Sequence, residues 1–161
     1  TRAPWSPRSC RSERAGGPTR RRVAGRDRCA VGAGDPGGRF GLELDVIERE
    51  SLQENARVVG AYAQEGLLRL AEKYPWIGDV RGYGLFFGAE MVLDREAKTP
   101  ATAYVARAVN EMRQRGILLN RLGIHYNTLK IRPPMPFSKE NADHLLAVLD
   151  DVLRHLGDPN G

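Results

Sequence analysis

"TLKIRPPMPFSKENADHLLAVLDDVL", residues 128–153, decides how the end of this 161-residue chain folds. Its β-prone start, residues 128–132, predicts a strand that runs into a double proline. Ser138 then suits the N-cap of a helix. The apolar residues of this helix recur at spacings of three and four, which places them on one face: Ala142, Leu145, Leu146, Leu149, Val152, Leu153 and Leu156. The stretch therefore predicts a strand, a proline turn and an amphipathic helix in direct succession.

Two cations, Lys130 and Arg132, lie on the predicted strand just before the prolines. Side chains two residues apart on a strand point to the same face, so both cations can meet one anion. The alternative is structural: Lys130 faces solvent and Arg132 braces a loop, since cations near a strand end are commonly solvated. The residues alone leave both interpretations open.

A long helix is predicted upstream. Residues 42–49 fit two helical turns, and Ser51 to Glu54 form an S-x-x-E capping box, which favours a fresh helix start. Pro75 ends the pattern. One apolar stripe runs along this helix: Leu52, Ala56, Val59, Ala63, Leu67, Leu70 and Tyr74.

Strands and a further helix are predicted between the two. Residues 79–81 and 85–92 are β-prone, with Gly82 and Gly84 in the turn that joins them.

The middle helix is predicted to begin with Thr99 as N-cap and Pro100 as its first residue, and to close at Gly116. Residues 117–120 then predict a short strand. The helix stripe comprises Ala101, Tyr104, Val105, Ala108, Val109 and Met112. The order of elements indicates an α+β fold, a small antiparallel sheet packed by helices.

The first quarter of the chain differs in composition. Residues 1–40 hold ten arginines against three acidic residues, whereas the remaining 121 residues hold 15 basic and 17 acidic residues. This Arg/Gly/Pro-rich segment shows no apolar period, and we expect residues 1–41 to be disordered. A nucleic-acid-binding tail and a mitochondrial transit peptide are the alternatives. Aromatic residues for base stacking are nearly absent, and prolines and glycines break the amphipathic helix that a transit peptide needs.

The sequence gives weaker indications of the cellular setting and of catalytic groups than of the fold. Cys10 and Cys29 match no zinc spacing, which favours a reducing, cytoplasmic setting, and no apolar run is long enough to cross a membrane. The three histidines, at positions 125, 144 and 155, are expected to be solvated, and no metal-ligand spacing occurs. Glu90 can face either solvent or a pocket. The residues alone indicate a small module without a catalytic set of its own.

Four segments carry a resemblance: "DVIERESLQENARVVG" (45–60), "DVRGYGLFFGAEMV" (79–92), "RGILLN" (115–120) and "LKIRPPMPFSKENADHLLAVLDDVL" (129–153). Together they resemble the C-terminal small domain of class III (fold type I) pyridoxal-phosphate-dependent aminotransferases, in particular the branch of alanine–glyoxylate aminotransferase 2-like enzymes and ethanolamine-phosphate phospho-lyases. The resemblance implies a pyridoxal 5'-phosphate (PLP) enzyme that transfers an amino group between an amine or amino acid and a keto acid. It also implies a homodimer with active sites at the subunit interface.

The same resemblance implies that much of the enzyme's chemistry lies in a large domain. None of the four lysines, at positions 73, 98, 130 and 139, has the context of the family's cofactor lysine. We therefore expect residues 42–161 to be the small domain, the chain to be a fragment that is inactive alone, and no catalytic, cofactor-binding or metal-binding residue to be present. Residues 1–41 depart from the family, and their composition suggests a frameshifted or misassigned start.

The resemblance also assigns a substrate-binding site. In many members an arginine three residues before the Pro-Pro pair binds the substrate carboxylate, and Lys130 occupies that position here, with Arg132 immediately before Pro133. Lysine offers a point charge instead of a bidentate fork, which suits phosphate as well as carboxylate and suggests a phosphorylated amine. The competing hypothesis is a stand-alone interaction module whose Arg-rich tail grips nucleic acid or an acidic partner.

Overall fold

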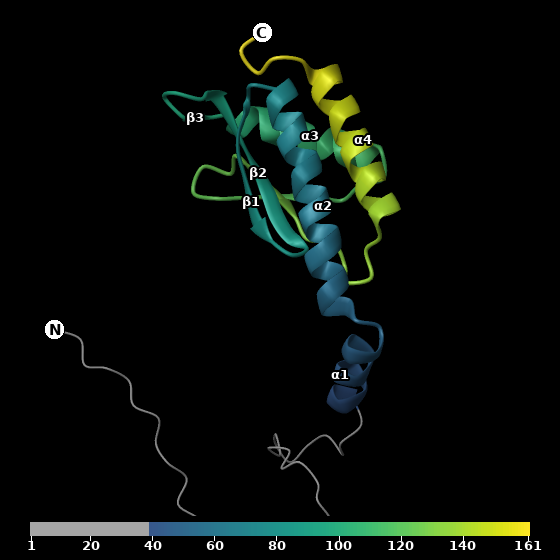
Figure 1. Cartoon of the computed structure of the whole chain (residues 1–161). Helices are drawn as coiled ribbons and strands as arrows, with labels where there is room; N and C mark the ends of the chain where they lie inside the picture. Colours follow the sequence, from purple (N-terminus) through teal and green to yellow (C-terminus); the bar gives the residue numbers. More distant parts are fainter. Residues whose placement is uncertain (1–38) are drawn as a thin grey trace, which may run out of the picture. The chain divides into compact units, whose positions relative to one another are not determined.

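Four helices and five short strands make up residues 39–161, the part of the chain that the computed structural model describes (Figure 1). The expectations for residues 1–38 lie outside these described residues. The elements, in chain order, are α1 (Arg39–Arg49), α2 (Leu52–Lys73), β1 (Ile77–Tyr83), β2 (Phe86–Asp94), β3 (Thr99–Pro100), α3 (Thr102–Gln114), β4 (Asn120–Leu122), β5 (Thr128–Ile131) and α4 (Lys139–Leu156). The predicted α+β class is confirmed.

The strands form one antiparallel sheet in the order β1-β2-β5-β4, with β3 paired to the end of β2. Ala89 of β2 pairs with Val80 of β1 on one side and with Leu129 of β5 on the other. Side chains alternate between the two faces along each strand, so Phe87, Ala89 and Met91 share one face with their cross-strand partners. This face is buried, and we call the opposite one the outer face.

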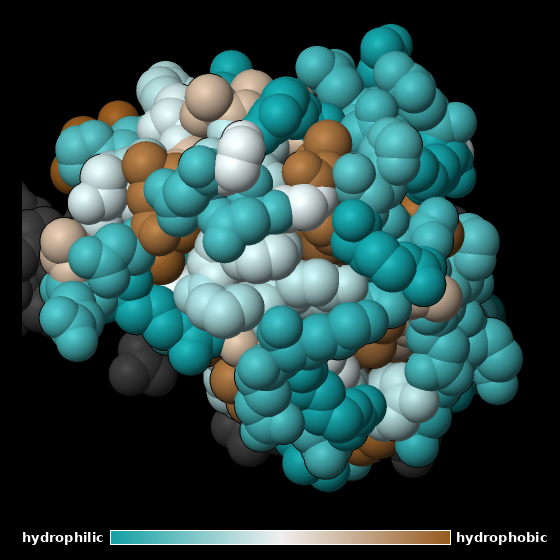
Figure 2. Space-filling model, turned by 90° about the horizontal axis from the view of Figure 1, so that it is seen from above, coloured by the Kyte–Doolittle hydropathy of each residue, from teal (hydrophilic) through white to brown (hydrophobic). Residues whose placement is uncertain are grey.

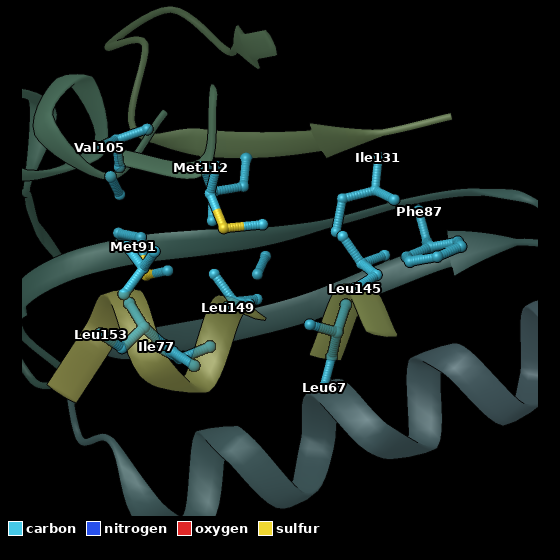
Figure 3. Packing of buried hydrophobic residues seen from close by; sticks show 14 of the residues in the cluster. Leu67, Ile77, Phe87, Met91, Val105, Met112, Ile131, Leu145, Leu149 and Leu153 are labelled. Atoms are coloured by element: carbon cyan, nitrogen blue, oxygen red, sulfur yellow. The ribbon is translucent and has the colours of Figure 1, made fainter. Parts of the chain in front are cut away.

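The core lies between the sheet and the helices. Helices α2 and α3 contact the strands, and α4 packs against both helices. Figure 3 shows leucines of α4 and apolar side chains of the strands directed toward one another. The predicted stripes are confirmed as the core-facing sides of the helices, because most of their residues are buried and the rest are partly buried. The largest fully buried side chains are Tyr104, Leu67, Ile77, Met91, Met112, Leu129, Ile131, Leu149, Leu153, Val105 and Val152.

Two predicted helix boundaries are confirmed, together with the hydrogen bonds expected to form there. The Ser138 hydroxyl accepts a hydrogen bond from the backbone N–H of Asn141 at 3.3 Å, as an N-cap does. Gly116 adopts φ 84° after α3, and the N–H of Ile117 bonds the carbonyl of Met112 at 2.9 Å. With the bond from Gly116 N–H to the Arg113 carbonyl, this is the Schellman arrangement that favours glycine.

The predicted capping box at the start of α2 is wrong, although the helix does start there. Ser51 lies in the left-handed region, at φ 50° and ψ 38°, and its side chain makes no capping hydrogen bond. Glu54 instead bonds Arg57 one turn on. The chain needs a sharp bend between α1 and α2, and the conformation of Ser51 that supplies it moves the hydroxyl away from the N-cap geometry.

The predicted N-cap at Thr99 is also wrong, because Thr99 and Pro100 pair with β2 as strand β3. The carboxylate of Asp94 accepts from the N–H of Glu96 at 2.8 Å and so stabilises the turn of this hairpin. The helix starts later, at Thr102, without a side-chain cap. Tertiary pairing therefore overrides the local Thr-Pro signal.

The strand predicted over residues 117–120 is shifted, since β4 covers Asn120–Leu122. The N–H of Ile117 is already used by the bond that closes α3. The chain thus joins the sheet three residues later than the apolar run suggested.

The surface of the described part is mostly hydrophilic in the view of Figure 2, with hydrophobic residues in small separate patches. No helix in residues 39–161 combines the length and the apolar character that crossing a membrane requires.

Replacing Leu149 with alanine should destabilise the protein by about 2–5 kcal/mol, because its side chain is fully buried on α4 and a cavity would remain. Leu68→Ala is the matched control, since Leu68 of α2 is 52% exposed and its loss should cost less than about 0.5 kcal/mol. Urea unfolding of both variants checks this. Equal effects would contradict the assignment of the α4 stripe to the core.

The stability of the fold at alkaline pH depends in part on the buried hydroxyl of Tyr104. Its side chain is 2% exposed, and its hydroxyl donates to the Gly157 carbonyl at 3.0 Å. Burial, chiefly, raises the pKa of Tyr104 from 10 to about 12. The unfolded chain ionises at lower pH than the folded one, so the stability linked to this group is present below pH 10 and is lost as pH rises from 10 towards 12.

We expect Tyr104→Phe to remove this contribution to the loss of unfolding free energy at high pH, which amounts to about 2 kcal/mol between neutral pH and about pH 11.5. Unfolding free energies measured between neutral pH and about pH 11.5 check this, with Tyr83→Phe as a control because the Tyr83 ring is 86% exposed. A Tyr104→Phe variant with an unchanged alkaline slope would contradict the role of this hydroxyl.

Candidate functional site

The Pro-Pro segment is held against the first turns of α2 by one side chain. The amide nitrogen of Asn55 donates to the carbonyl of Met135 at 2.7 Å and to that of Phe137 at 3.0 Å. Both hydrogens of the amide are thereby used in contacts that span 80 and 82 residues of sequence. The path of the chain from β5 to α4 is fixed by these bonds.

The backbone of the turn between β1 and β2 lies very close to the backbone of the same helix. A methyl group at Gly60 of α2 would overlap the carbonyl of Gly84 in the turn, so only glycine fits at position 60. Gly84 itself adopts φ 53°, which confirms its predicted place in the turn. Gly82, predicted in the same turn, instead lies in β1 and pairs with Phe87. The side chain of Gln64 donates to the Gly60 carbonyl at 3.2 Å, beside the turn.

An open cleft of about 940 Å³ lies between these anchored segments. Its walls come from α1, the first turns of α2, the β1–β2 turn and the Pro-Pro segment. The residues that line it are Ile47, Glu48, Ser51, Gln53, Glu54, Ala56, Arg57, Tyr83, Gly84, Leu85, Phe86, Arg132, Pro133, Pro134 and Met135. The cleft combines apolar walls with charged groups at its rim, as small-molecule sites do.

The two arginines of the cleft differ in their pairing. Arg57 bonds Glu54 through two nitrogens, at 2.8 and 2.5 Å, so its charge is already matched. Arg132 is exposed and, within residues 39–161, forms no ion pair or side-chain hydrogen bond. It also lines a smaller cavity of about 340 Å³ on the other side of the prolines, together with His144 and Asn141. Arg132 is therefore the cation of this site that is available to an anion.

Lys130 lies on the outer face of β5, between Leu129 and Ile131 of the core. It is half-buried and is not among the residues that line either cavity. Strand β5 ends at Ile131, so the alternation of side chains along the strand does not by itself place Arg132. That both cations meet one anion stays a prediction.

Glu90 also lies on the outer face, where it is held by two partners. Its carboxylate accepts from Arg81 at 2.7 Å and from the amide of Asn127 at 3.2 Å. The hydrogen bond from Arg81, the largest influence, lowers the pKa of Glu90, so this group stays ionised at neutral pH. Glu90 is thus committed to a local ion pair.

In the described part of the chain, residues 39–161, the histidines and acidic residues offer no metal site. His125, His144 and His155 are exposed, as predicted. Among residues 39–161, no three His, Cys, Asp or Glu side chains gather as metal ligands would.

The class of proteins to which this α+β domain belongs follows from a comparison with known families. Residues 40–153 match the model of the family "Aminotransferase class-III". The chain belongs to the class III aminotransferases.

Individual relatives give the same result. The chain is 48% identical over 107 residues to a protein of Arabidopsis thaliana named alanine–glyoxylate aminotransferase 2 homolog 2, mitochondrial. A phospholyase from Arthrobacter, solved in complex with phosphoethanolamine, is 37% identical with a TM-score of 0.68 over 71% of this chain. An amine transaminase from an uncultivated Pseudomonas species, solved in its PLP-bound form, is 32% identical with a TM-score of 0.65 over 71% of this chain.

The match covers a limited part of these proteins. The aligned region is 66% of this chain and 22% of the Arabidopsis protein, and it is 27% and 26% of the two solved chains. The chain therefore spans about a quarter of the length of its relatives.

The lysines of this chain do not fit the role of the residue that binds PLP covalently. None of the four lysines lines a described cavity. Lys73 donates to Asp150 at 2.6 Å, and this bond raises the pKa of Lys73. Lys139 lies 5.4 Å from the centre of the Tyr62 ring, and Lys98 lies in the β2–β3 turn with φ 53°.

We expect the chain to form no stoichiometric adduct with PLP, because a Schiff base that persists needs an unprotonated lysine inside a site that holds the cofactor. The measurement is borohydride reduction after incubation with PLP, followed by dialysis and peptide mass spectrometry. Low labelling spread over several lysines is the expected result. Complete labelling of one lysine, with the label lost when that residue alone is substituted, would contradict this expectation.

Proposed function

We propose that residues 42–161 serve as the C-terminal small domain of a class III aminotransferase, and that Lys130 and Arg132 bind the anionic group of the substrate. The observation that carries this proposal is the pairing of the cations. Neither Lys130 nor Arg132 has an acidic partner within residues 39–161, whereas the three cations of α2 and Arg81 of β1 are each paired with a carboxylate. Arg132 lines the cleft, whereas Lys130 lies on the outer face of β5. A cation without an acidic partner favours binding of an anion.

The reaction of the whole enzyme, on this proposal, is transfer of an amino group between an amine or amino acid and a keto acid. PLP supplies the electron sink for such chemistry when it is bound, and residues other than those described here would hold it. The small domain would bind and orient the substrate. Assembly as a homodimer and a cytoplasmic setting are expectations that accompany this proposal, and the Arabidopsis relative is named as mitochondrial.

The ammonium of Lys130, at the position where many family members have an arginine, makes a phosphorylated amine a candidate substrate beside an ordinary amino acid. A guanidinium grips a planar carboxylate with two parallel hydrogen bonds, whereas an ammonium acts as a point charge with three donors. Lys130 therefore suits the spread oxygens of a phosphate at least as well as a carboxylate. The solved phospholyase complex with phosphoethanolamine, at 37% identity, supports this choice.

Other residues would position the cations. The Asn55 amide holds Met135 and Phe137, and so fixes the proline segment that follows Arg132. The apolar walls of the cleft would exclude water around the bound group and so strengthen its attraction to the charge. The competing interaction-module hypothesis gains no support, because its Arg-rich tail lies outside the described residues.

The test uses residues 42–161 in place of the matching segment of a class III enzyme that carries the cofactor lysine. In this chimera, Lys130→Ala and Arg132→Ala should each raise KM for O-phosphoethanolamine by about tenfold, since a hydrogen bond to a charged group contributes roughly 1.5–3 kcal/mol. The thermal midpoint should stay unchanged, because neither side chain forms a bond within the fold.

Arg113→Ala and Arg154→Ala are the control variants. Both residues lie in the last turns of their helices, α3 and α4, and line neither cavity beside the prolines, so they should leave KM at the wild-type value. If Lys130→Ala and Arg132→Ala also keep the wild-type kcat/KM, the two cations do not bind the substrate.

A further inference from the structure

A row of four residues crosses the outer face of the sheet at the level of Lys130. Arg81 of β1 pairs with Gly88 of β2, Gly88 with Lys130 of β5, and Lys130 with Asn120 of β4. Paired residues of antiparallel strands point to the same face, with Cβ atoms about 4.5–5.5 Å apart. Gly88 has no side chain, so Asn120 provides the only side chain directly opposite Lys130 within the described sheet.

The acidic residues of the outer face are held elsewhere. Glu90, one row away, accepts from Arg81 at 2.7 Å and from Asn127 at 3.2 Å. Asp79 is bonded to the same arginine. Arg81 thus draws both carboxylates to the β1 side of the face, and the charge of Lys130 stays without an ion pair in the described part of the chain.

The amide of Asn120 is oriented by a bond to its own strand. Its Oδ1 accepts the backbone N–H of Arg121 at 2.8 Å. A backbone N–H can bond only to the oxygen of the amide, so this contact assigns the two ends of the group. The NH₂ end keeps both of its donors, and residues 39–161 offer it no acceptor. Asn120 is thereby a donor opposite the Lys130 ammonium, and no carboxylate of residues 39–161 pairs with that ammonium.

We propose that Asn120 is a positioning residue of the anion site, and that its NH₂ group and the Lys130 ammonium donate to different oxygens of one phosphate group. This inference rests on the proposed role of Lys130 and adds a second strand to the site. A phosphate presents three terminal oxygens in a tetrahedral arrangement, so it can accept from two separate donors on neighbouring strands. A planar carboxylate fits one fork better, which makes Asn120 a group that favours phosphate.

The experiment is an NMR titration of the full chain with O-phosphoethanolamine, inorganic phosphate and acetate. Asn120→Asp keeps the oxygen that accepts from Arg121 but replaces the donors with a carboxylate beside Lys130. It should weaken binding of both phosphate compounds by about tenfold or more, and Asn120→Ala by a smaller factor. Asn120→Gln, which keeps the amide, should retain part of the wild-type affinity. The thermal midpoint should stay at its wild-type value in all three variants.

Asn110→Asp is the matched control, because it makes the same change of charge on the exposed side of α3 and should leave binding unaltered. If Lys130→Ala loses phosphate while Asn120→Asp and Asn120→Ala bind as the wild type does, the role of Asn120 is wrong and that of Lys130 stands. If Lys130→Ala and Asn120→Asp both bind normally, both assignments fail. A wild-type chain whose Lys130 and Asn120 signals do not respond to phosphate, or respond equally to acetate, would also overturn the inference.

Discussion

The two hydrogen bonds of the Asn55 amide connect parts of this structure that lie far apart in the sequence. They join the first turns of α2 to the segment between the double proline and α4. Because Ser138 follows Phe137 directly, the same bonds set where α4 begins to pack on α2. One of them also holds Met135, which lines the same cleft as Arg132. Two helices, a turn and a cation are therefore placed by one side chain, and backbone carbonyls that proline leaves without strand partners are satisfied.

The parts of the fold that depend on a local period were predictable from the sequence. The stripes of α2, α3 and α4 are buried as their spacing indicated, and Ser138 and Gly116 end their helices as expected. The errors lie where a contact between distant residues outweighs the local signal. Thr99 and Pro100 resemble a helix start, yet pairing with β2 makes them a strand. Ser51 has the residue type of a cap, but its backbone is required for the bend between α1 and α2.

The candidate site was predictable only in part, for a related reason. Lys130 and Arg132 stand out because they precede a double proline and match a family pattern. Gly60, Asn55 and Asn120 gave no signal, since an isolated glycine or asparagine has many uses and its partner lies far along the chain. Strand pairing brings Asn120 opposite Lys130, and the register becomes known only from the folded sheet. Residues that position a charged group are thus harder to predict than the charged group itself.

The two edge strands of the sheet, one short and one charged, affect how copies of the chain can contact each other. An unpaired strand edge can bind the edge of another molecule and start a continuous sheet. Here one edge, β4, offers only the three residues Asn120–Leu122, too few for a stable added strand. The other edge, β1, is longer but carries a register shift between Ile77 and Asp79 and the charged pair of Asp79 and Arg81. Charge and irregularity oppose edge-to-edge growth, so a five-stranded sheet this small is protected against forming fibres through its own strands.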